Sequence, residues 1–206
     1  MTAITKLPKG EVTRQRILDA GEVVFAELGF AAARLEDVAN AVGIRRASIV
    51  YYFKSKQELY DAVESGLFSA LQQESRERLA KGGSACEQMQ LLFDSWLDFM
   101  VARPTAARII QRNSADITPR SSNPVEFSEA TVREMENVLA KGRDSGEFTA
   151  IEPTLFLSFT GGAIINYVCL SQLFGSERIY DPAEPERLEM FRAMLHKTWR
   201  ALLLPT

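Results

Sequence analysis

Apolar side chains recur along this chain at intervals of three and four residues, which is the spacing of one face of an α-helix. The stretch 35–42 shows this clearly, because Leu35, Val38, Ala39 and Val42 share one side of the expected helix. No segment shows the strict alternation of apolar and polar residues that predicts a strand, and no internal repeat is present. The pattern therefore predicts an all-α fold of about nine helices.

Glycine, proline and capping residues divide this pattern into separate helices. Gly29 and Gly43 fall where helices are expected to end, and Thr13 and Ser84 are placed to act as N-caps. Residues 114–124, with two prolines and three serines, predict a loop. The expected helices run from Thr13 to Gly29, Leu35–Val42, Ala47–Phe53, Lys56–Leu79, Ser84 to the stop at Arg103 and Pro104, Thr105–Asn113, Val125–Lys141, Pro153–Phe174 and Glu186–Leu204.

Two of these helices are short and follow each other closely. Leu35–Val42 is joined to Ala47–Phe53 by a link that begins with Gly43. Two short helices joined by a glycine-containing turn are typical of a helix-turn-helix, whose second helix can enter the major groove of DNA. On that second helix Ile49 and Phe53 share a side and are expected to anchor it to the core. The pattern thus predicts a DNA-binding unit near the start of the chain.

The sequence GIRRASIVYYFKSKQEL at residues 43–59 resembles the signature of TetR-type transcriptional regulators, roughly G-V-S-x-G-x-L-Y-x-Y/H-F-x-S/N-K-x-x-L. By motif the resemblance covers about the first 60 residues. It implies a three-helix DNA-binding head over residues 1–56 and a helical effector-binding and dimerisation body over residues 57–206. Proteins of this type pair as homodimers through their last two helices, here Pro153–Phe174 and Glu186–Leu204. The implied function is a homodimeric repressor that a small, largely apolar ligand releases from a palindromic operator.

DNA contacts are expected from the helix-turn-helix and the residues beside it. Arg45 and Arg46 lie at the end of the second helix that points at DNA in this docking mode, and we expect Arg46 to read a base. The sequence departs from the family where Val50 replaces a Tyr and Arg34 replaces a frequent capping Ser or Thr. Lys56 matches the phosphate-binding lysine of the family. The expected contact residues are Arg34, Arg45, Arg46, Ser48, Tyr51, Tyr52 and Lys56, with packing inside the head as the alternative for the two tyrosines.

The resemblance also implies an effector pocket in the body. Aromatic walls with a few polar groups suit small ligands. The expected lining residues are Trp96, Phe99, Met100, Phe159, Asn166 and Tyr167, each of which has ordinary core packing as its alternative role. Charged groups of a ligand would find partners in Arg108, Arg112 and Asp116, although these side chains are equally consistent with solvated surface positions.

Charge and composition narrow the class of protein. The net charge is −3, but residues 1–56 carry nine Lys and Arg against six Asp and Glu, so the expected head is basic and the body acidic. Cys86 and Cys169 form no metal or redox motif, and His196 is the only histidine. No catalytic residues, metal site or cofactor are therefore expected. No apolar run is long enough to span a membrane and no signal peptide is evident, so a cytoplasmic location is expected.

Two other hypotheses remain open at the level of sequence. In one, the DNA-binding head is joined to a body that takes no small-molecule effector and responds to a protein or to nothing. In the other, the chain is a helical enzyme or lipophilic carrier that happens to contain a helix-turn-helix. A ligand panel that never shifts the melting temperature, with DNA binding intact, would favour the body without an effector. Turnover or tight binding of hydrophobic ligands, with no specific DNA binding, would favour the enzyme or carrier.

Overall fold

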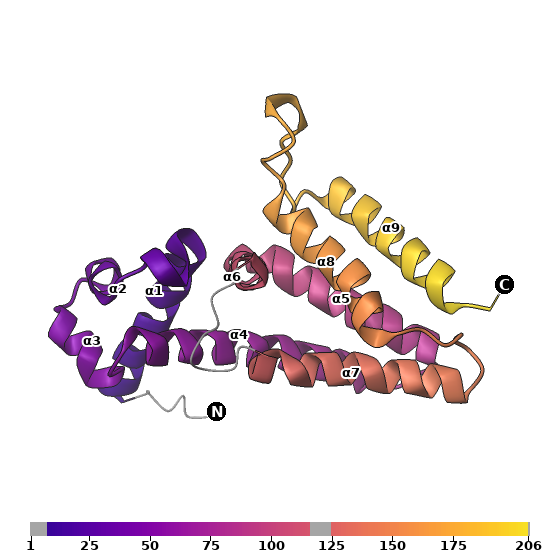
Figure 1. Cartoon of the computed structure of the whole chain (residues 1–206), viewed down its shortest axis with the longest axis horizontal. Coiled ribbons are helices and arrows are strands. Elements are labelled where there is room, and N and C mark those ends of the chain that lie inside the picture. The colour runs from indigo at the N-terminus through magenta and orange to yellow at the C-terminus, as the bar shows by residue number, and fades with distance from the viewer. Residues whose placement is uncertain (1–7, 116–124, 206) are drawn as a thin grey trace, which may run out of the picture. The chain divides into compact units, whose positions relative to one another are not determined.

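The computed structural model describes residues 8–115 and 125–205 of the chain. These residues form nine α-helices and one short 3-10 helix, with no strand among them, which confirms the predicted all-α fold. Figure 1 shows the order of the helices along the chain. They are α1 (Lys9–Ala32), α2 (Leu35–Val42), α3 (Arg46–Tyr52), α4 (Lys56–Leu79), α5 (Ala85–Ala102), α6 (Pro104–Ala115), α7 (Val125–Asp144), α8 (Pro153–Cys169) and α9 (Pro185–Leu203), with the 3-10 helix η1 (Ser176–Arg178) before α9.

The chain divides into two compact units, a head that ends at Gly66 and a body that begins at Leu67. The division falls inside α4, about ten residues after Lys56, the first residue of that helix, whereas the head was predicted to end at residue 56. Because α4 continues through the division, no flexible linker separates the two units.

The head consists of α1, α2, α3 and the first part of α4. Helix α2 contacts both α1 and α3. The core of the head contains Ile17 and Val38, which are fully buried, together with Tyr60, which is 2% exposed. Ile49 and Phe53 of the α3 region are 0% and 1% exposed, so their predicted role as anchors is confirmed.

Two helix ends in the head depend on glycines with positive φ. Gly29 (φ 76°, ψ 165°) interrupts α1, and Gly43 (φ 76°, ψ 34°) ends α2 in the left-handed conformation that glycine tolerates best. Both positions were predicted as helix ends. The predicted N-cap at Thr13 is wrong, because α1 begins at Lys9 and Thr13 Oγ1 donates to Lys9 O inside the helix.

The body is organised around α5, which contacts α6, α7, α8 and α9 (Figure 1). Met89, Leu92, Phe93 and Leu97 of α5 are all 0% exposed, so this helix supplies the centre of the core. Helix α8 ends at Cys169, five residues before the predicted end. Beyond it the chain folds into turns, and Ser171 O accepts from the N–H of Tyr180 in the following loop.

Candidate functional site

The helix-turn-helix predicted from sequence is formed by α2 and α3. The N–H groups of Gly43 and Ile44 both donate to Ala39 O, at 2.9 and 3.0 Å, and close α2. Arg45 follows in an extended conformation (φ −76°, ψ 147°), and its carbonyl accepts from Ser48 N–H at 2.8 Å to start α3. With Ile49 buried against the head, the opposite side of α3 is free to meet a partner.

The outward side of α3 carries Ala47, Ser48 and Tyr51. Tyr51 is 76% exposed and meets the ring of Tyr52 edge to face, with centroids 5.1 Å apart. Tyr52 is half-buried, and its hydroxyl lies close to Gly10 at the start of α1. Of the two tyrosines expected at DNA, only Tyr51 therefore stands clear of the head.

The two arginines at the start of α3 differ in their partners. Arg46 Nε lies 2.7 Å from Glu36 Oε1 of α2, and Arg46 precedes buried Ile49 by three residues on the same side of the helix. Both members of this ion pair are more than half exposed, so the pair contributes little stability. Arg45 is exposed and its side chain has no partner among residues 8–115 and 125–205. Of the two arginines, Arg45 is thus the one whose side chain is available to a partner.

Lys56, expected at phosphate, has its ammonium group inside the head. Lys56 Nζ donates to the carbonyl oxygens of Phe30, Ala31 and Ala33 at 2.6, 3.3 and 3.0 Å, and it also lies 4.4 Å from the centre of the Phe30 ring. An ammonium group has three hydrogens, and these carbonyls use all of them. Lys56 therefore closes the end of α1 against the start of α4, and the structure leaves it no hydrogen for phosphate.

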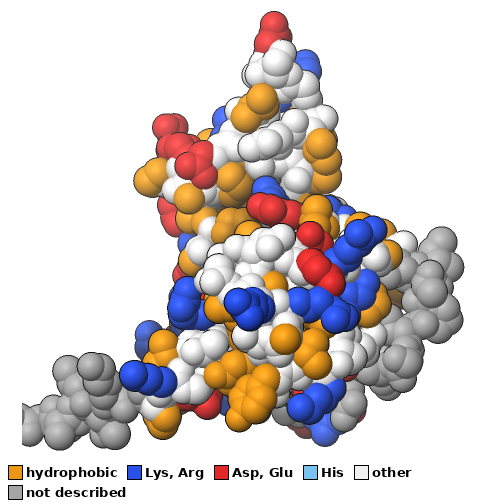
Figure 2. Space-filling model, turned by 90° about the vertical axis from the view of Figure 1, so that its left-hand side faces the viewer, with side chains coloured by type: hydrophobic (Ala, Val, Ile, Leu, Met, Phe, Trp, Pro, Cys, Tyr) orange, Lys and Arg blue, Asp and Glu red, His pale blue; other side chains and the backbone are white. Residues whose placement is uncertain are grey.

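Other basic side chains of the head also have internal partners. Arg16 donates to Val42 O at 3.0 Å, and the Arg14 guanidinium lies 5.0 Å from the centre of the Phe53 ring. Arg34 precedes α2; its own N–H donates to Asp37 Oδ2 at 2.8 Å, while its exposed side chain has no partner in the described part of the chain. On the side of the molecule drawn in Figure 2, Lys and Arg side chains are scattered among hydrophobic ones and do not form one continuous basic patch.

The body contains a cavity of about 480 Å³ between α4, α5, α6, α7 and α8. None of the residues that line it is Asp, Glu, Lys, Arg or His, so the wall as described carries no charge. A volume of this size suits a small organic ligand. The residues that line it include Phe68, Trp96, Gln111, Thr131, Gly161 and Asn166.

Three of the six residues predicted to line a pocket do so, namely Trp96, Met100 and Asn166. The other three lie elsewhere. Phe99 is buried on another side of α5, and Phe159 is 72% exposed on the outer side of α8. Tyr167 stacks on Phe191 with ring centroids 4.1 Å apart, and its hydroxyl donates to Pro182 O. Periodicity found the helices but not which side of each helix faces the cavity. Arg108 and Arg112 are exposed and do not line the cavity, and Asp116 lies outside the described residues.

Sequence reasoning missed Thr131, which lines the cavity from α7. Its Oγ1 and the Nε1 of Trp96 are buried and hydrogen-bond nothing in the described part of the chain. A signal was present, because Thr131 interrupts the apolar stripe that continues at Met135 and Val138. A buried polar group without a partner destabilises the protein, so two of them on one cavity wall require an explanation.

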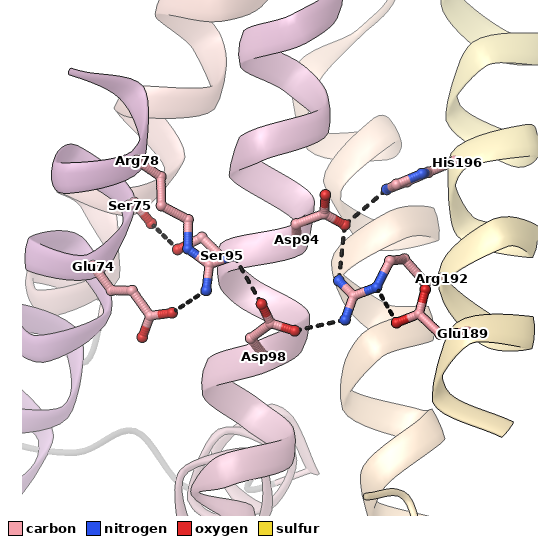
Figure 3. Close-up of polar contacts among 9 residues, drawn as sticks. All are labelled: Glu74, Ser75, Arg78, Asp94, Ser95, Asp98, Glu189, Arg192 and His196. Atoms are coloured by element: carbon pink, nitrogen blue, oxygen red, sulfur yellow. Dashed lines mark hydrogen bonds and ion pairs between the residues drawn. The ribbon is translucent and has the colours of Figure 1, made fainter. Parts of the chain in front are cut away.

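A second polar cluster lies on a different side of α5 and joins it to α4 and α9 (Figure 3). Arg192 of α9 donates to Asp94 Oδ1 at 2.9 Å and to Asp98 Oδ1 at 2.7 Å, and its Nε to Glu189 at 2.9 Å. Burial by itself lowers the pKa of Arg192, but the hydrogen bonds to these carboxylates outweigh it and raise the pKa. Arg78 of α4 completes the cluster at 2.8 Å from Asp98 Oδ2.

His196 belongs to the same cluster, with Nε2 2.8 Å from Asp94 Oδ1. A His–Asp contact can be part of a catalytic site, but Asp94 is shared here with Arg192. Within the described ranges no group of three or more His, Cys, Asp or Glu side chains is arranged to hold a metal ion. The contacts of His196 thus fit a structural role between α9 and α5.

Comparison with known proteins supports the features of the head. Residues 17–63 match the family model described as bacterial regulatory proteins, tetR family. This match includes α2, α3 and the start of α4, which are the elements that form the helix-turn-helix and its support. In the described residues, no helix is long and apolar enough to cross a bilayer.

Solved structures extend the likeness of fold to the body. A tetR family transcription regulator from Shewanella sp. PV-4 is 18% identical, with a TM-score of 0.75 over 94% of this chain and 99% of that one. FadR from Bacillus subtilis, solved in complex with stearoyl-CoA, is 19% identical, with a TM-score of 0.69 over 89% of this chain and 95% of that one. The ketosteroid transcriptional regulator KstR2 of Mycobacterium tuberculosis is 20% identical, with a TM-score of 0.67 over 94% and 95%. Residues 17–63 thus match a tetR-family DNA-binding head, and the fold shared over nearly the whole length supports a TetR-type transcriptional regulator.

Proposed function

We propose that this regulator is a homodimeric repressor that binds a palindromic DNA operator and leaves it when a small, largely apolar ligand enters the cavity of the body. The proposal rests on two features of the same chain, an exposed side of α3 and a cavity whose described wall carries no charge. Such a protein works in the cytoplasm, where its operator lies.

The DNA contacts we propose come from the outward side of α3 and from both helix starts. Arg45 would read a base edge in the major groove, and Tyr51 and Ser48 would add contacts beside it. Arg34, at the start of α2, would bind a phosphate. Arg46 would contribute less, because Glu36 already neutralises it. Lys56 would support α4 from inside the head.

The dimer we propose pairs the outer sides of α8 and α9. Leu155 and Phe159 of α8 are 65% and 72% exposed, and Met190 and Met194 of α9 are 63% and 65% exposed. Each pair is spaced by four residues and so forms a stripe along its helix. Neighbouring apolar stripes on two contacting helices are typical of a surface that another protein covers.

The ligand would act through α4. Phe68 and Leu71 of this helix line the cavity, and the first residues of the same helix belong to the head. A ligand releases DNA only if it binds the DNA-incompetent conformation more tightly than the competent one. Among the fold relatives, FadR from Bacillus subtilis was solved with stearoyl-CoA, which supports a ligand-responsive body.

Selection of bound fragments from random duplex DNA, at about physiological salt, tests the proposal. We expect inverted repeats whose half-sites lie one helical turn apart, roughly 34–36 Å. As a matched control, Phe159→Glu changes an exposed side chain and should leave folding intact while preventing dimers. Recovery of single half-sites by both proteins would contradict the dimeric reader, and recovery of random sequence would contradict specific binding.

The alternative is a DNA-binding regulator whose body takes no small molecule. It predicts that DNA binding stays intact while no ligand changes the melting temperature. The volume of the cavity favours the ligand-responsive form, because about 480 Å³ is enough to bury a small organic ligand.

A further inference from the structure

The cavity wall combines an apolar lining with two polar groups that no described residue pairs. Most of its residues are aliphatic, aromatic or glycine, and the polar ones are uncharged. Gln111 Nε2 reaches Asn166 Oδ1 at 3.4 Å, and Ser114 and Ser158 donate to carbonyls of their own helices. Thr131 Oγ1 and Trp96 Nε1 are the wall atoms that stay buried without a hydrogen bond to any described residue.

An indole N–H can only donate, so Trp96 requires a hydrogen-bond acceptor, whereas the Thr131 hydroxyl can donate or accept. A charged ligand group would meet no opposite charge on this wall and would lose its hydration on entry. We propose that the cavity takes an uncharged, largely apolar ligand that carries a hydrogen-bond acceptor, with Trp96 and Thr131 as the residues that recognise its polar group. This inference rests on the proposed ligand-responsive function and specifies the class of ligand.

The class excludes a ligand whose anionic group must enter the cavity. A carboxylate or phosphate would be selected by an Arg or Lys on the wall, and the described wall has neither. The arginines of α6, Arg108 and Arg112, are exposed and are not part of the lining. The cavity therefore favours a ketone, ester, amide or alcohol over the corresponding acid.

Three naphthalene derivatives of nearly equal size test the class. These are 2-acetylnaphthalene, which is neutral with an acceptor, 2-ethylnaphthalene, which has none, and 2-naphthoate, which is an anion at neutral pH. Equilibrium dialysis against the full-length protein, without DNA, measures binding of each. We expect the ketone to bind about threefold to tenfold more tightly than the hydrocarbon and at least tenfold more tightly than the anion. An anion that binds as tightly as the ketone would overturn the proposal, as would failure of all three probes to bind.

Two variants locate the polar contact. Thr131→Val keeps the shape and removes the hydroxyl, and Trp96→Phe removes the N–H, so each should reduce the ketone-to-hydrocarbon ratio about threefold or more. The matched controls are Thr160→Val and Trp199→Phe, at buried residues that do not line the cavity. An unchanged ratio in both wall variants would overturn the assignment of these residues.

A third variant tests the site itself. Gly161 lines the cavity, and a Cβ placed there would lie 2.9 Å from Leu157 Cδ1, another wall atom. Gly161→Met should occupy cavity space and weaken the ketone and the hydrocarbon alike by about tenfold or more. Full binding of both probes by a folded Gly161→Met protein would show that they bind elsewhere.

The probe measurements and the DNA selection can fail independently of each other. Dialysis requires no operator, so probes that follow the expected order support the ligand class even if no DNA site is recovered. Conversely, an intact DNA selection with the wrong probe order would refute the ligand class and leave the DNA-binding function standing.

Discussion

Helix α5 has two sides that differ in how their polar groups are paired. On one side Asp94 and Asp98 are held by Arg192, with Arg78 and His196 completing the cluster. On another side Trp96 lines the cavity, and its N–H has no partner in the described part of the chain. The first arrangement holds α9 and α4 against α5, whereas the second leaves a polar group that is available to a bound molecule.

The same contrast occurs among the basic residues of the head. Lys56 donates its three ammonium hydrogens to backbone carbonyls, while Arg34 and Arg45 are exposed and unpaired within the described ranges. All three were expected at DNA from sequence. Pairing inside the protein therefore separates residues that hold the fold from residues that are available to a partner.

The largest effect should come from the paired side of α5. Arg192→Met removes one cation that contacts three carboxylates. Its contacts with Asp94 and Asp98 are partly buried, so we expect a loss of about 2–3 kcal/mol in the free energy of unfolding. Urea denaturation measures it. Arg200→Met is the control on the same helix, where the guanidinium donates to Gln90 and lies 5.2 Å from the centre of the Trp199 ring, and it should cost less than about 1 kcal/mol. Equal losses in Arg192→Met and Arg200→Met would show that the cluster contributes no more to stability than the contacts of Arg200.

The unpaired arginine before α3 should affect recognition and not stability. Arg45→Ala should relax preference at one base pair in each half-site by about 1–3 kcal/mol and change the free energy of unfolding by less than about 0.5 kcal/mol. Affinities over a set of operator variants measure the preference. Arg46→Ala is the matched control and should have the smaller effect, since Glu36 already holds its guanidinium. The reverse order would return the base-reading role to Arg46.

Two buried threonines should respond with opposite signs. Thr131→Val removes an unpaired hydroxyl and should raise the free energy of unfolding by about 1 kcal/mol in the absence of ligand. Thr160 Oγ1 donates to Phe156 O at 2.8 Å, so Thr160→Val should lower it by about 0.5–1 kcal/mol. Thermal and urea unfolding measure both. A loss in Thr131→Val would mean that its hydroxyl is paired inside the protein.

The smallest effect concerns a paired carboxylate at the start of α5. The N–H groups of Cys86 and Ala85 donate to Glu147 and lower the pKa of its carboxyl below the ordinary 4.5. This stabilisation is present above the ordinary pKa and is lost as the pH falls through the lowered pKa. Glu147→Gln should therefore be slightly less stable than wild type at pH 7 and equal to it in acid. A difference that persists unchanged at low pH would contradict the charge-dependent cap.

Local signals in the sequence predicted the helices and their ends well. Positive φ at Gly43 and burial of Ile49 and Phe53 follow from residue type and spacing within a few positions. The partners of Lys56 are carbonyls 23 to 26 positions earlier in the chain, and spacing along one helix gives no information on them. A family motif could therefore suggest phosphate for this lysine without revealing that its hydrogens are already used.

The cavity was only partly predictable for a related reason. The lining expected from the family resemblance correctly drew on α5 and α8, but it included Phe159 and overlooked Thr131. An apolar residue on a helix can face the core, the cavity or a partner molecule, and only the packing of helices against one another decides which. The exposed stripe that contains Phe159 was recognised as a candidate dimer surface only because α8 contacts α9, which carries a second exposed apolar stripe.

The most direct test of the contrast between paired and unpaired groups is the salt dependence of operator affinity in Arg34→Met and Lys56→Met, measured well below the unfolding temperature of each variant. If Arg34 binds phosphate in each half of a dimer, Arg34→Met should flatten the slope of log K against log salt by about two units, with unchanged stability. Lys56→Met should leave the slope unchanged and lower the melting temperature, because three carbonyls lose their donor. A slope that flattens in Lys56→Met at unchanged stability, with no change in Arg34→Met, would contradict the account.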